Sequence, residues 1–469
     1  MIKVNELINF WANVKPESVA FADDSHEITF RELDISTRKI GFLLKEKGIK
    51  KGQIVCLILP GYPGWIFSLT LYRLGVTTMM QNNLNSFSSE LVPDWVVSLD
   101  PHPDIDVNHT IISDKNYMAQ VATSSELDNF EGFADDSDIA TFYSTSGTNG
   151  ETKYQAIEAG HMWTEASRVH SSNAFGEDDV FMLLPFGAAW TSLHVSTCLI
   201  FGKAYYNCKY TDYRLQRFVG RYPIRTIIGS PIQVAGFLES QKEDQMDLPR
   251  LKTVIMGGSP PSEQLVKRIK LQLDCRIFNA YGSTEAGLIA MSSLGNMEPE
   301  GAWINPLMDL QIVDDDENIL PAMSVGHIRY RRSNMPMSYY KNPIATSQFF
   351  REGYFYPGDL GYIDKNGRLL LEGRSTDVIN LGGVKINPER IESYALSIPG
   401  VFDCAAYSAL NGAGVEELCI AIVVDGNFNP SNFEKTMEKR FPNLVRQAKI
   451  VNTIPRNETG KIQRNLLAT

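Results

Sequence analysis

Apolar runs and helix-patterned segments alternate along much of this chain, and the alternation limits the folds open to it. Between residues 178 and 282 the sequence predicts strands at 180–184, 204–207, 226–228, 253–256 and 276–279. Helical patterns lie between them; in the clearest, Leu265, Ile269 and Leu273 recur on one face and Ser262 offers an N-cap. Strands separated by helices favour a parallel sheet, because each helix carries the chain back to the same edge.

The N-terminal region repeats this pattern. Residues 28–34 predict a strand that turns into an amphipathic helix, and turns at Gly48 and Gly52 lead to a buried strand at 54–59. Residues 60–63 interrupt that strand, and helical spacing resumes at 65–74. The acidic run 314–317 lies between two short apolar runs and predicts a solvated hairpin turn rather than a metal site. These patterns together predict an α/β fold.

Composition excludes several classes of function. With 469 residues, 43% of them hydrophobic, the chain has enough apolar surface for a large core. A net charge of −11 argues against nucleic acid or an anionic membrane surface as the main partner, because both need clustered cations. The six cysteines are scattered without a Cys-x-x-Cys pair and are typical of reduced thiols in a cytoplasmic protein. No signal peptide or membrane-spanning segment is expected.

One stretch, residues 144–153, carries the residue types that bind phosphate. It reads Ser-Thr-Ser-Gly-Thr-Asn-Gly-Glu-Thr-Lys, after an apolar run at 139–143 and before a helix-like segment. Its glycines let consecutive N–H groups face one concavity, its hydroxyls add donors and its lysine adds a mobile charge. It is not a Walker A loop, because Gly147 and Gly150 are three residues apart and Lys153 does not directly follow a glycine. Read alone, the stretch also fits an ordinary polar surface loop.

Further motifs follow in order along the chain. Residues 257–261 (Gly-Gly-Ser-Pro-Pro) and 280–287 (Ala-Tyr-Gly-Ser-Thr-Glu-Ala-Gly) each come after a predicted strand. Residues 356–361 read Tyr-Pro-Gly-Asp-Leu-Gly, and residues 373–392 begin Gly-Arg-Ser-Thr-Asp and contain a Gly-Gly pair. Residues 455–464 read Pro-Arg-Asn-Glu-Thr-Gly-Lys-Ile-Gln-Arg. Taken singly, each has a plain structural explanation as a tight turn, a helix cap or a solvated lysine.

Taken together, these motifs resemble those of the adenylate-forming superfamily, which includes acyl- and aryl-CoA ligases, peptide-synthetase adenylation domains and luciferases. The 144–153 loop resembles the signature Thr/Ser-Ser-Gly-Thr/Ser-Thr-Gly-x-Pro-Lys-Gly and departs from it at Asn149, Thr152 and Tyr154. The resemblance covers almost the entire chain. The part between Asn82 and the loop is short for the family, which predicts a trimmed peripheral element.

The resemblance implies a two-domain organisation. A large N-terminal domain, residues 1–373, with alternating strands and helices would bind ATP and the acid. A hinge at 374–377 would lead to a small mobile α+β C-terminal domain, residues 378–469, which begins with a helix near Arg390. Thr376 stands at the hinge, where the family usually has Asp or Lys.

The same resemblance assigns nucleotide contacts. Tyr281 would stack on adenine, Thr284 would bond the α-phosphate region, and Glu285 would hold Mg²⁺, a hard cation that prefers oxygen ligands. Asp359 would accept hydrogen bonds from the ribose hydroxyls, and Arg374 would contact ribose or phosphate. The expected ATP site also contains Ser144, Thr145, Ser146, Gly147, Thr148, Gly150, Lys153, Gly258, Ser259, Asn279, Gly282 and Ser283. Pro357 replaces a threonine of the family pattern.

The implied reaction activates a carboxylic acid with ATP and Mg²⁺ and passes the acyl group to a phosphopantetheine thiol. Lys461 would be the catalytic lysine of adenylation, acting with Thr284 and Glu285. Gly382 and Gly383 would let the backbone approach the phosphopantetheine arm of CoA or a carrier protein. Between the two half-reactions the C-terminal domain would turn about the hinge.

The acid is predicted from the segment 184–192. The aspartate that adenylation domains use for the ammonium of α-amino acids is absent here, and Ala188 stands near the slot of a histidine common in acyl-CoA ligases. A flat slot that would suit an aryl or unsaturated acid is predicted from Ala188, Ala189, Trp190, Gly257, Gly258 and Gly282. The same small residues are equally compatible with helix packing.

Three functions stay open at the level of sequence. A CoA ligase and a stand-alone enzyme that loads an acyl carrier protein share every motif above. A basic docking patch for an acidic carrier is expected only in the second, and Lys435, Lys439, Arg440, Arg446 and Lys449 are its candidates. The third is a catalytically silent nucleotide-binding protein, which the departures at Asn149, Thr152, Pro357 and Thr376 leave open.

Overall fold

The computed structural model divides into two compact units. The first comprises residues 1–228, 239–251 and 334–348, and the second comprises 229–238, 252–333 and 349–469. The residues that the structure describes are 4–81, 91–101, 109–146, 152–171, 179–208, 215–240, 250–295, 301–375, 379–381, 384–410, 416–442, 445–456 and 462–467. No helix among these residues is both long and apolar enough to cross a membrane. The hinge and domain boundaries implied by the sequence stay predictions.

The first unit alternates strands and helices, as the sequence predicted. Its helices are α1 (Val4–Val14), α2 (Phe30–Lys47), α3 (Gly61–Leu74), α4 (Lys115–Thr123), α5 (Ala159–Ser171), α6 (Ala189–Phe201), α7 (Leu215–Arg221) and α10 (Pro343–Phe349). Its strands are β1 (Val19–Ala22), β2 (Glu27–Thr29), β3 (Ile54–Ile58), β4 (Thr77–Met80), β5 (Trp95–Ser98), β6 (Thr110–Ile112), β7 (Ile139–Ser146), β8 (Thr152–Glu158), β9 (Asp179–Met182), β10 (Tyr205–Asn207) and β11 (Ile224–Gly229).

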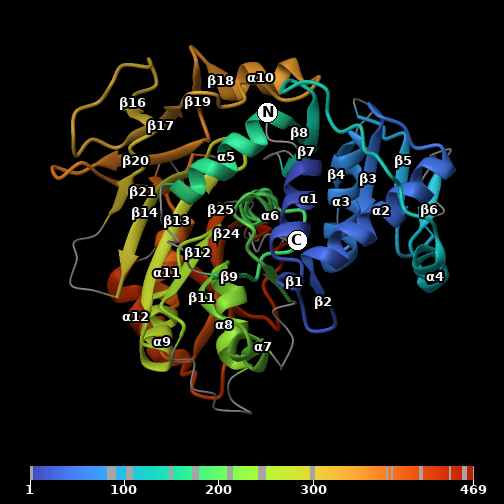
Figure 1. Ribbon diagram of the computed structural model, residues 1–469. Helices are drawn as coiled ribbons and strands as arrows, with labels where there is room; N and C mark the ends of the chain where they lie inside the picture. The colour runs from blue at the N-terminus through green and yellow to red at the C-terminus, as the bar shows by residue number, and fades with distance from the viewer. Residues whose placement is uncertain are drawn as a thin grey trace. The chain divides into compact units, whose positions relative to one another are not determined.

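Two sets of strands organise this unit. Six strands form a sheet in the order β6-β5-β3-β4-β7-β8, in which neighbours run parallel except for the antiparallel pair β7–β8 (Figure 1). Strands β11, β9, β10 and β1 pair parallel in that order, and β2 returns antiparallel to β1. Helix α3 packs on β3 and β4 and is buried around its whole circumference, including its polar residues Ser68, Thr70 and Arg73.

Local signals explain where several elements begin and end. Thr29 and Glu32 form a capping box at the start of α2, and Gly48 ends that helix in the left-handed region with φ = 101°. Helix α3 begins at Gly61, earlier than the predicted 65, because Pro63 lies in the first turn, where a missing N–H costs nothing. Ser262 caps helix α9 (Glu263–Leu273) as predicted.

The second unit contains the motifs downstream of residue 252. Its helices are α8 (Pro231–Glu239), α9 (Glu263–Leu273), α11 (Pro388–Ala395) and α12 (Pro430–Arg440), with a 3₁₀ turn η1 (Arg464–Leu466). Its strands are β12 (Thr253–Gly257), β13 (Arg276–Ser283), β14 (Gly287–Leu294), β15 (Ala302–Ile304), β16 (Asp309–Val313), β17 (Gly326–Arg331), β18 (Phe350–Arg351), β19 (Tyr354–Phe355), β20 (Asp359–Ile363), β21 (Arg368–Arg374), β22 (Ile379–Leu381), β23 (Val384–Ile386), β24 (Val401–Leu410), β25 (Glu416–Val424) and β26 (Val445–Ile450).

A mixed sheet carries most of this unit. Strands β12 and β13 are parallel, and β14, β15, β21, β20 and β17 follow in order with antiparallel pairing. The predicted acidic turn is confirmed between β16 and β17: the Asp314 carboxylate accepts bonds from the backbone N–H groups of Asp316 and Asn318. These bonds hold the pKa of that carboxyl below its ordinary value, Asn318 contributing most.

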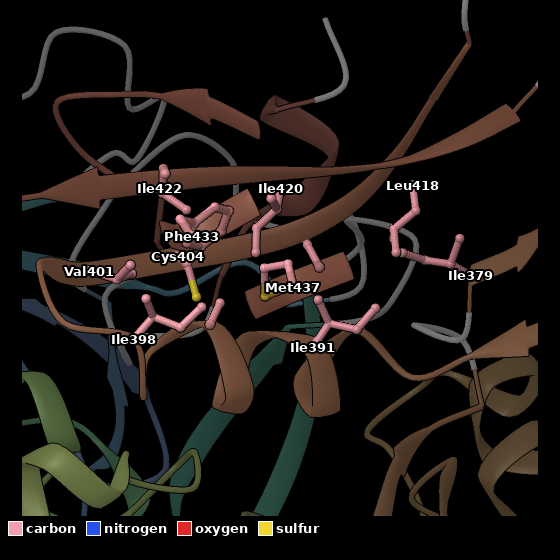
Figure 2. Close-up of a cluster of buried hydrophobic side chains, with 12 residues drawn as sticks. Ile379, Ile391, Ile398, Val401, Cys404, Leu418, Ile420, Ile422, Phe433 and Met437 are labelled. Atoms are coloured by element: carbon pink, nitrogen blue, oxygen red, sulfur yellow. The ribbon is translucent and has the colours of Figure 1, made fainter. Parts of the chain in front are cut away.

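The C-terminal part of the unit has its own small core. Strands β24, β25 and β26 form a sheet, and helices α11 and α12 pack against it. Figure 2 shows the side chains between strands and helices, among them Ile391, Cys404, Ile420, Phe433 and Met437. This arrangement of helices on one face of a short sheet agrees with the α+β character predicted for the C-terminal region.

The segment after the 144–153 loop corrects one sequence expectation. A helix-like segment was expected there, but the chain forms β8, which pairs with β7 residue by residue, and α5 begins only at Ala159. Pairing with the neighbouring strand β7 overrides local helical preference, since the hydrogen bonds and burial of a sheet outweigh the weak intrinsic scale. All six cysteines are buried, and none forms a disulfide.

Candidate active site

The glycine-containing loop is the connection of the β7–β8 hairpin. Thr145 pairs with Lys153 across this hairpin, and the Lys153 ammonium lies 5.3 Å from the centroid of the Tyr339 ring. Ser144 is exposed and Thr145 half-buried, so both hydroxyl-bearing residues reach the surface. Ser146 ends β7. Gly147, Thr148 and Gly150, which were assigned to the ATP site, lie outside the described residues.

The structure explains two departures from the family loop. Tyr154, where the family has glycine, is buried in a core with Phe142 and Met79, and its hydroxyl accepts a 2.7 Å bond from Gln81 Nε2. Its carbonyl oxygen also accepts a bond from the Tyr340 N–H, so the tyrosine supports the base of the hairpin. Thr152 begins β8 opposite Ser146 and keeps the backbone N–H that the usual proline lacks.

The predicted acid-binding segment surrounds the start of α6. Ala188 is the N-cap of that helix and makes no side-chain capping bond, and Ala188, Ala189 and Trp190 are half-buried. Gly187 has φ = 101°, and a Cβ built there would lie 3.1 Å from the Met80 Cβ. These residues belong to the first unit, whereas Gly257, Gly258 and Gly282 belong to the second. One slot formed by both groups stays a prediction.

In the second unit, parallel pairing brings two predicted motifs to one edge of the sheet. Gly257 at the end of β12 pairs with Ala280 of β13, so the Gly258–Ser259 turn begins level with Ala280, while β13 continues to Ser283 paired with β14. Gly258 has φ = 89°, a conformation that glycine adopts without strain. Asn279 presents a buried Oδ1 that accepts no hydrogen bond from any described residue. A donor on a bound nucleobase would satisfy that oxygen.

Thr284 and Glu285 lie in the turn between β13 and β14. Ser283 Oγ accepts a 3.2 Å bond from the Ala286 N–H and closes this turn. Thr284 is half-buried, and Glu285 is only 8% exposed. A buried carboxylate held in a short turn is a suitable oxygen ligand for a divalent cation.

Tyr281, Asp359 and Arg374 form one cluster from three strands. Asp359 of β20 is directly opposite Arg374 of β21, and Arg374 Nε lies 3.3 Å from Asp359 Oδ1. The Tyr281 hydroxyl donates to the other oxygen, Asp359 Oδ2. Burial, then the Asp359 carboxylate, raises the pKa of Tyr281 well above its ordinary value, so the phenol stays a donor. Sequence analysis assigned all three residues to the nucleotide, and the fold brings them into direct contact.

Two supporting residues were missed from the sequence. The Tyr330 hydroxyl donates a 3.1 Å bond to Ser283 Oγ, and Arg332 Nε donates a 3.0 Å bond to the Ala286 carbonyl. Both residues thereby fix the turn that carries Thr284 and Glu285. The only signal in the sequence is the run Arg-Tyr-Arg-Arg at 329–332, which no known spacing links to residue 285.

The remaining assigned residues cannot be placed. Lys461, Thr376, Gly382 and Gly383 lie outside the described residues. The structure describes their neighbours: Ser375 donates through its N–H and its hydroxyl to the Gly358 carbonyl, at 2.7 and 2.9 Å. Pro357, next to Gly358, lies between β19 and β20. The roles assigned to all of these residues stay predictions.

Comparison with characterised proteins gives consistent relatives. Acyl-coenzyme A synthetase ACSM4, mitochondrial, of Mus musculus is 25% identical over 514 aligned residues, covering 98% of this chain and 85% of that protein. The 2-succinylbenzoate–CoA ligase of Geobacillus sp. (strain WCH70) is 25% identical over 492 residues, covering 97% of this chain and 95% of the ligase.

Solved structures share the fold. The anthranilate CoA ligase AuaEII in complex with anthranoyl-AMP superposes with a TM-score of 0.86 at 18% identity, covering 99% of this chain and 96% of that one. The o-succinylbenzoate CoA synthetase of Bacillus subtilis with ATP and magnesium ion superposes with a TM-score of 0.83 at 20% identity, covering 99% of both chains. The predicted fold class is confirmed.

The family model described as "AMP-binding enzyme" matches residues 8–340, which is more than half of the chain. The resemblance to the adenylate-forming superfamily that was read from the motifs is therefore confirmed, and the chain belongs to the family of AMP-binding enzymes.

Proposed function

We propose that this protein is an AMP-forming acid–thiol ligase that activates a carboxylic acid other than an α-amino acid and transfers it to CoA. The observation that carries the proposal is the Tyr281–Asp359–Arg374 cluster in the same unit as the buried Glu285. An aromatic ring can stack on a base, a carboxylate can accept hydrogen bonds from ribose hydroxyls, and a guanidinium can pair with a phosphate. The family match and the names of the relatives support the same reaction.

The chemistry has two steps. In the first, a carboxylate oxygen attacks the α-phosphorus of ATP, the bond to pyrophosphate breaks, and an acyl-adenylate forms. In the second, a thiol loses its proton and attacks the acyl carbon, and AMP leaves. Catalysis of the first step is mostly positioning and charge neutralisation.

The residues of this chain fit those demands. The aromatic face of Tyr281 would hold adenine while its hydroxyl keeps Asp359 in place for the ribose. The buried Asn279 Oδ1 would accept a bond from the base. Mg²⁺, held by Glu285, would neutralise charge on the phosphates. Lys153 and the hydroxyls of the β7–β8 loop would bind the β- and γ-phosphates, and Lys461 would bridge the carboxylate and the transferring phosphoryl group.

An aryl or unsaturated acid is the proposed substrate class. The half-buried residues Ala188, Ala189 and Trp190 at the start of α6 offer little side-chain volume and one flat ring. Several relatives have names with an aromatic acid: 2-succinylbenzoate–CoA ligase and 4-coumarate:CoA ligase 1 of Petunia hybrida, 24% identical over 482 residues. The mouse relative is named only as an acyl-coenzyme A synthetase, so straight-chain acids belong in the test.

CoA is the proposed acceptor rather than a carrier protein. The exposed residues Lys435, Lys439 and Arg440 lie on α12, but Glu434 and Glu438 alternate with them along the same helix. The helix therefore does not present a surface of one sign to an acidic partner. Loading of a carrier protein stays the alternative, because it uses the same chemistry up to the thiol.

The first experiment is acid-dependent pyrophosphate release with ATP and Mg²⁺ across aryl, short-chain, long-chain and amino acids. We expect release with aryl or unsaturated acids, and thioester formation when CoA is added. Thioester formation only with an acyl carrier protein would favour the alternative acceptor. If no acid in the panel causes pyrophosphate release, but ATP still binds in a filter or calorimetric assay, the protein binds nucleotide without catalysing the reaction.

The role of Lys461 has a separate test. Lys461→Ala should lower adenylation by roughly 100-fold or more, because charge stabilisation in the transition state is lost. The same variant should still transfer a preformed acyl-adenylate to CoA. Equal loss in both half-reactions would remove Lys461 from this role.

A further inference from the structure

The last motif contains an arginine that the reaction above does not use. Arg464 Nη2 lies 2.8 and 2.9 Å from the two carboxylate oxygens of Glu392, and Arg464 Nε donates a 3.0 Å bond to the Ala406 carbonyl. The Ala406 N–H donates a 2.8 Å bond back to Glu392 Oε1. The Glu392 side chain is 9% exposed and that of Arg464 is 20% exposed. Arg464 is thus bonded to both α11 and β24.

A second set of contacts holds the other end of the same segment. Arg456 forms an isolated antiparallel bridge with Ile462, and the Gln463 N–H donates a 2.9 Å bond to the Pro455 carbonyl. Arg456 Nη2 lies 2.6 Å from Asp403 Oδ1, in the same strand as Ala406. Residues 455–456 and 462–464 are therefore tied to each other and to β24.

Apolar packing attaches α11 to the sheet, in addition to the bond from the Ala406 N–H to Glu392. Ile391, Ala395 and Ile398 contact Cys404, Ile420 and Met437 in the core shown in Figure 2. Burial raises the pKa of the Glu392 carboxyl even against the opposing effect of Arg464, so the ionised carboxylate is costly at this place. Buried ion pairs contribute little net stability compared with apolar side chains, but they fix geometry. What Glu392 adds to the core is a defined link to residue 464.

We propose that Glu392 is a positioning residue for the adenylation step: through Arg464 it sets the place of the chain from which Lys461 extends. The inference rests on the proposed role of Lys461, which itself lies outside the described residues. Three residues of chain span at most about 10 Å, so the position of residue 464 limits the region that residue 461 can reach. Displacement of a reacting group by about 1 Å can cost about 100-fold in rate.

The test is Glu392→Gln, which keeps the volume and one oxygen for the Ala406 N–H but loses the charge that holds Arg464. We expect the kcat of acid-dependent pyrophosphate exchange to fall about 10- to 100-fold, as expected for a misplaced group. The KM values for ATP and acid, and the transfer of preformed acyl-adenylate to CoA, should stay within about twofold of the unchanged protein. Glu392→Asp, which keeps the charge, should recover part of the lost rate.

Met437→Ala is the matched control, because it loosens the same core without touching residues 455–464. It should lower the melting temperature at least as much as Glu392→Gln does. The ratio between the rates of the two half-reactions should stay unchanged. If both half-reactions fall together in Glu392→Gln, or if Met437→Ala reproduces its selective loss, Glu392 is merely structural. If Glu392→Gln does not fold, Arg464→Lys takes its place with the same expectations.

Lys461→Ala, measured alongside, separates the two proposals. Normal adenylation in Lys461→Ala overturns the proposed role of the lysine and this inference with it. Lost adenylation in Lys461→Ala together with normal adenylation in Glu392→Gln overturns this inference alone.

Discussion

At the scale of single residues, the proposed nucleotide cluster (Tyr281, Asp359 and Arg374) is built so that each member holds the next. Asp359 has one oxygen facing Arg374 Nε and the other bonded by the Tyr281 hydroxyl. A carboxylate held at both oxygens keeps one orientation, so it loses little conformational entropy when a ligand hydroxyl binds to it. We therefore propose two separable functions for Tyr281: its ring would stack on the base, and its hydroxyl orients Asp359.

Tyr281→Phe should separate those functions. The ring stays, but a hydrogen bond to a charged group, typically worth about 1.5–3 kcal/mol, is lost. We expect the KM for ATP in pyrophosphate exchange to rise by about tenfold or more. Tyr354→Phe is the control, since that hydroxyl also bonds a carboxylate, Asp309 Oδ2 at 2.7 Å, outside the nucleotide cluster. Equal KM changes in the two variants would contradict the assignment.

His194 of α6 provides a prediction about pH. Burial lowers the pKa of His194 from 6.5 to about 4, with Lys203 adding to the shift. Between these values the unfolded chain binds a proton that the folded chain does not. The free energy of unfolding should therefore be highest above about pH 6.5 and fall by up to about 3 kcal/mol as the pH drops to 4. Urea unfolding of the unchanged protein and of His194→Gln between pH 4.5 and 7.5 checks this; identical slopes would refute it.

At the scale of elements, the β13–β14 hairpin is the part of the site with least room for change. A register shift separates Tyr281 from Gly282, and a Cβ built on Gly282 would lie 2.5 Å from the Gly287 carbonyl oxygen of β14. Only glycine lets the two strands approach this closely beside the Thr284–Glu285 turn. The hairpin geometry, rather than any single bond, fixes where Glu285 lies.

Gly282→Ala should therefore damage the site more than the fold. Moving β13 from β14 to admit the methyl group costs roughly 1–3 kcal/mol. We expect ATP affinity, measured by calorimetry, to fall by about tenfold or more, with a melting temperature lowered by only a few degrees. Gly426→Ala, at a position where a Cβ would contact nothing within 4 Å, should change neither quantity. Unchanged ATP affinity in Gly282→Ala would show that the hairpin tolerates separation.

At the scale of the whole molecule, we propose that the C-terminal domain takes two arrangements, one for each half-reaction. The predicted pivot is Thr376, next to Ser375, which is bonded to the Gly358 carbonyl. Through these bonds Ser375, the residue before the predicted pivot, is held next to the start of β20.

Thr376→Pro should restrict that pivot, because proline fixes φ near −65° and removes an N–H. We expect the overall rate of thioester formation to fall by about tenfold or more while one of the two half-reactions, assayed alone, stays near its original rate. Rapid-quench assays of pyrophosphate release and of transfer from preformed acyl-adenylate measure the two separately. Equal loss in both would argue against a hinge at this residue.

The sequence by itself determined the class of fold, and its motifs suggested by resemblance which residues would bind the nucleotide. Hydrophobic periodicity placed β9 to β13 and α9, because burial of one face repeats at the period of the element. The resemblance of the motifs to those of the adenylate-forming superfamily assigned Tyr281, Glu285, Asp359 and Arg374 to the nucleotide and its Mg²⁺, and these roles stay predictions.

Only the tertiary structure decided what lies between those motifs. That β8 is a strand depends on its pairing with the neighbouring strand β7. That Tyr154 fills a core, and that Tyr330 and Arg332 hold the Glu285 turn, depends on partners distant in sequence. The same holds for Glu392 and Arg464, which are 72 residues apart. These long-range contacts are properties of the assembled fold. The same residue type can fill a core, bind a ligand or support another residue, and only its neighbours in the fold decide which.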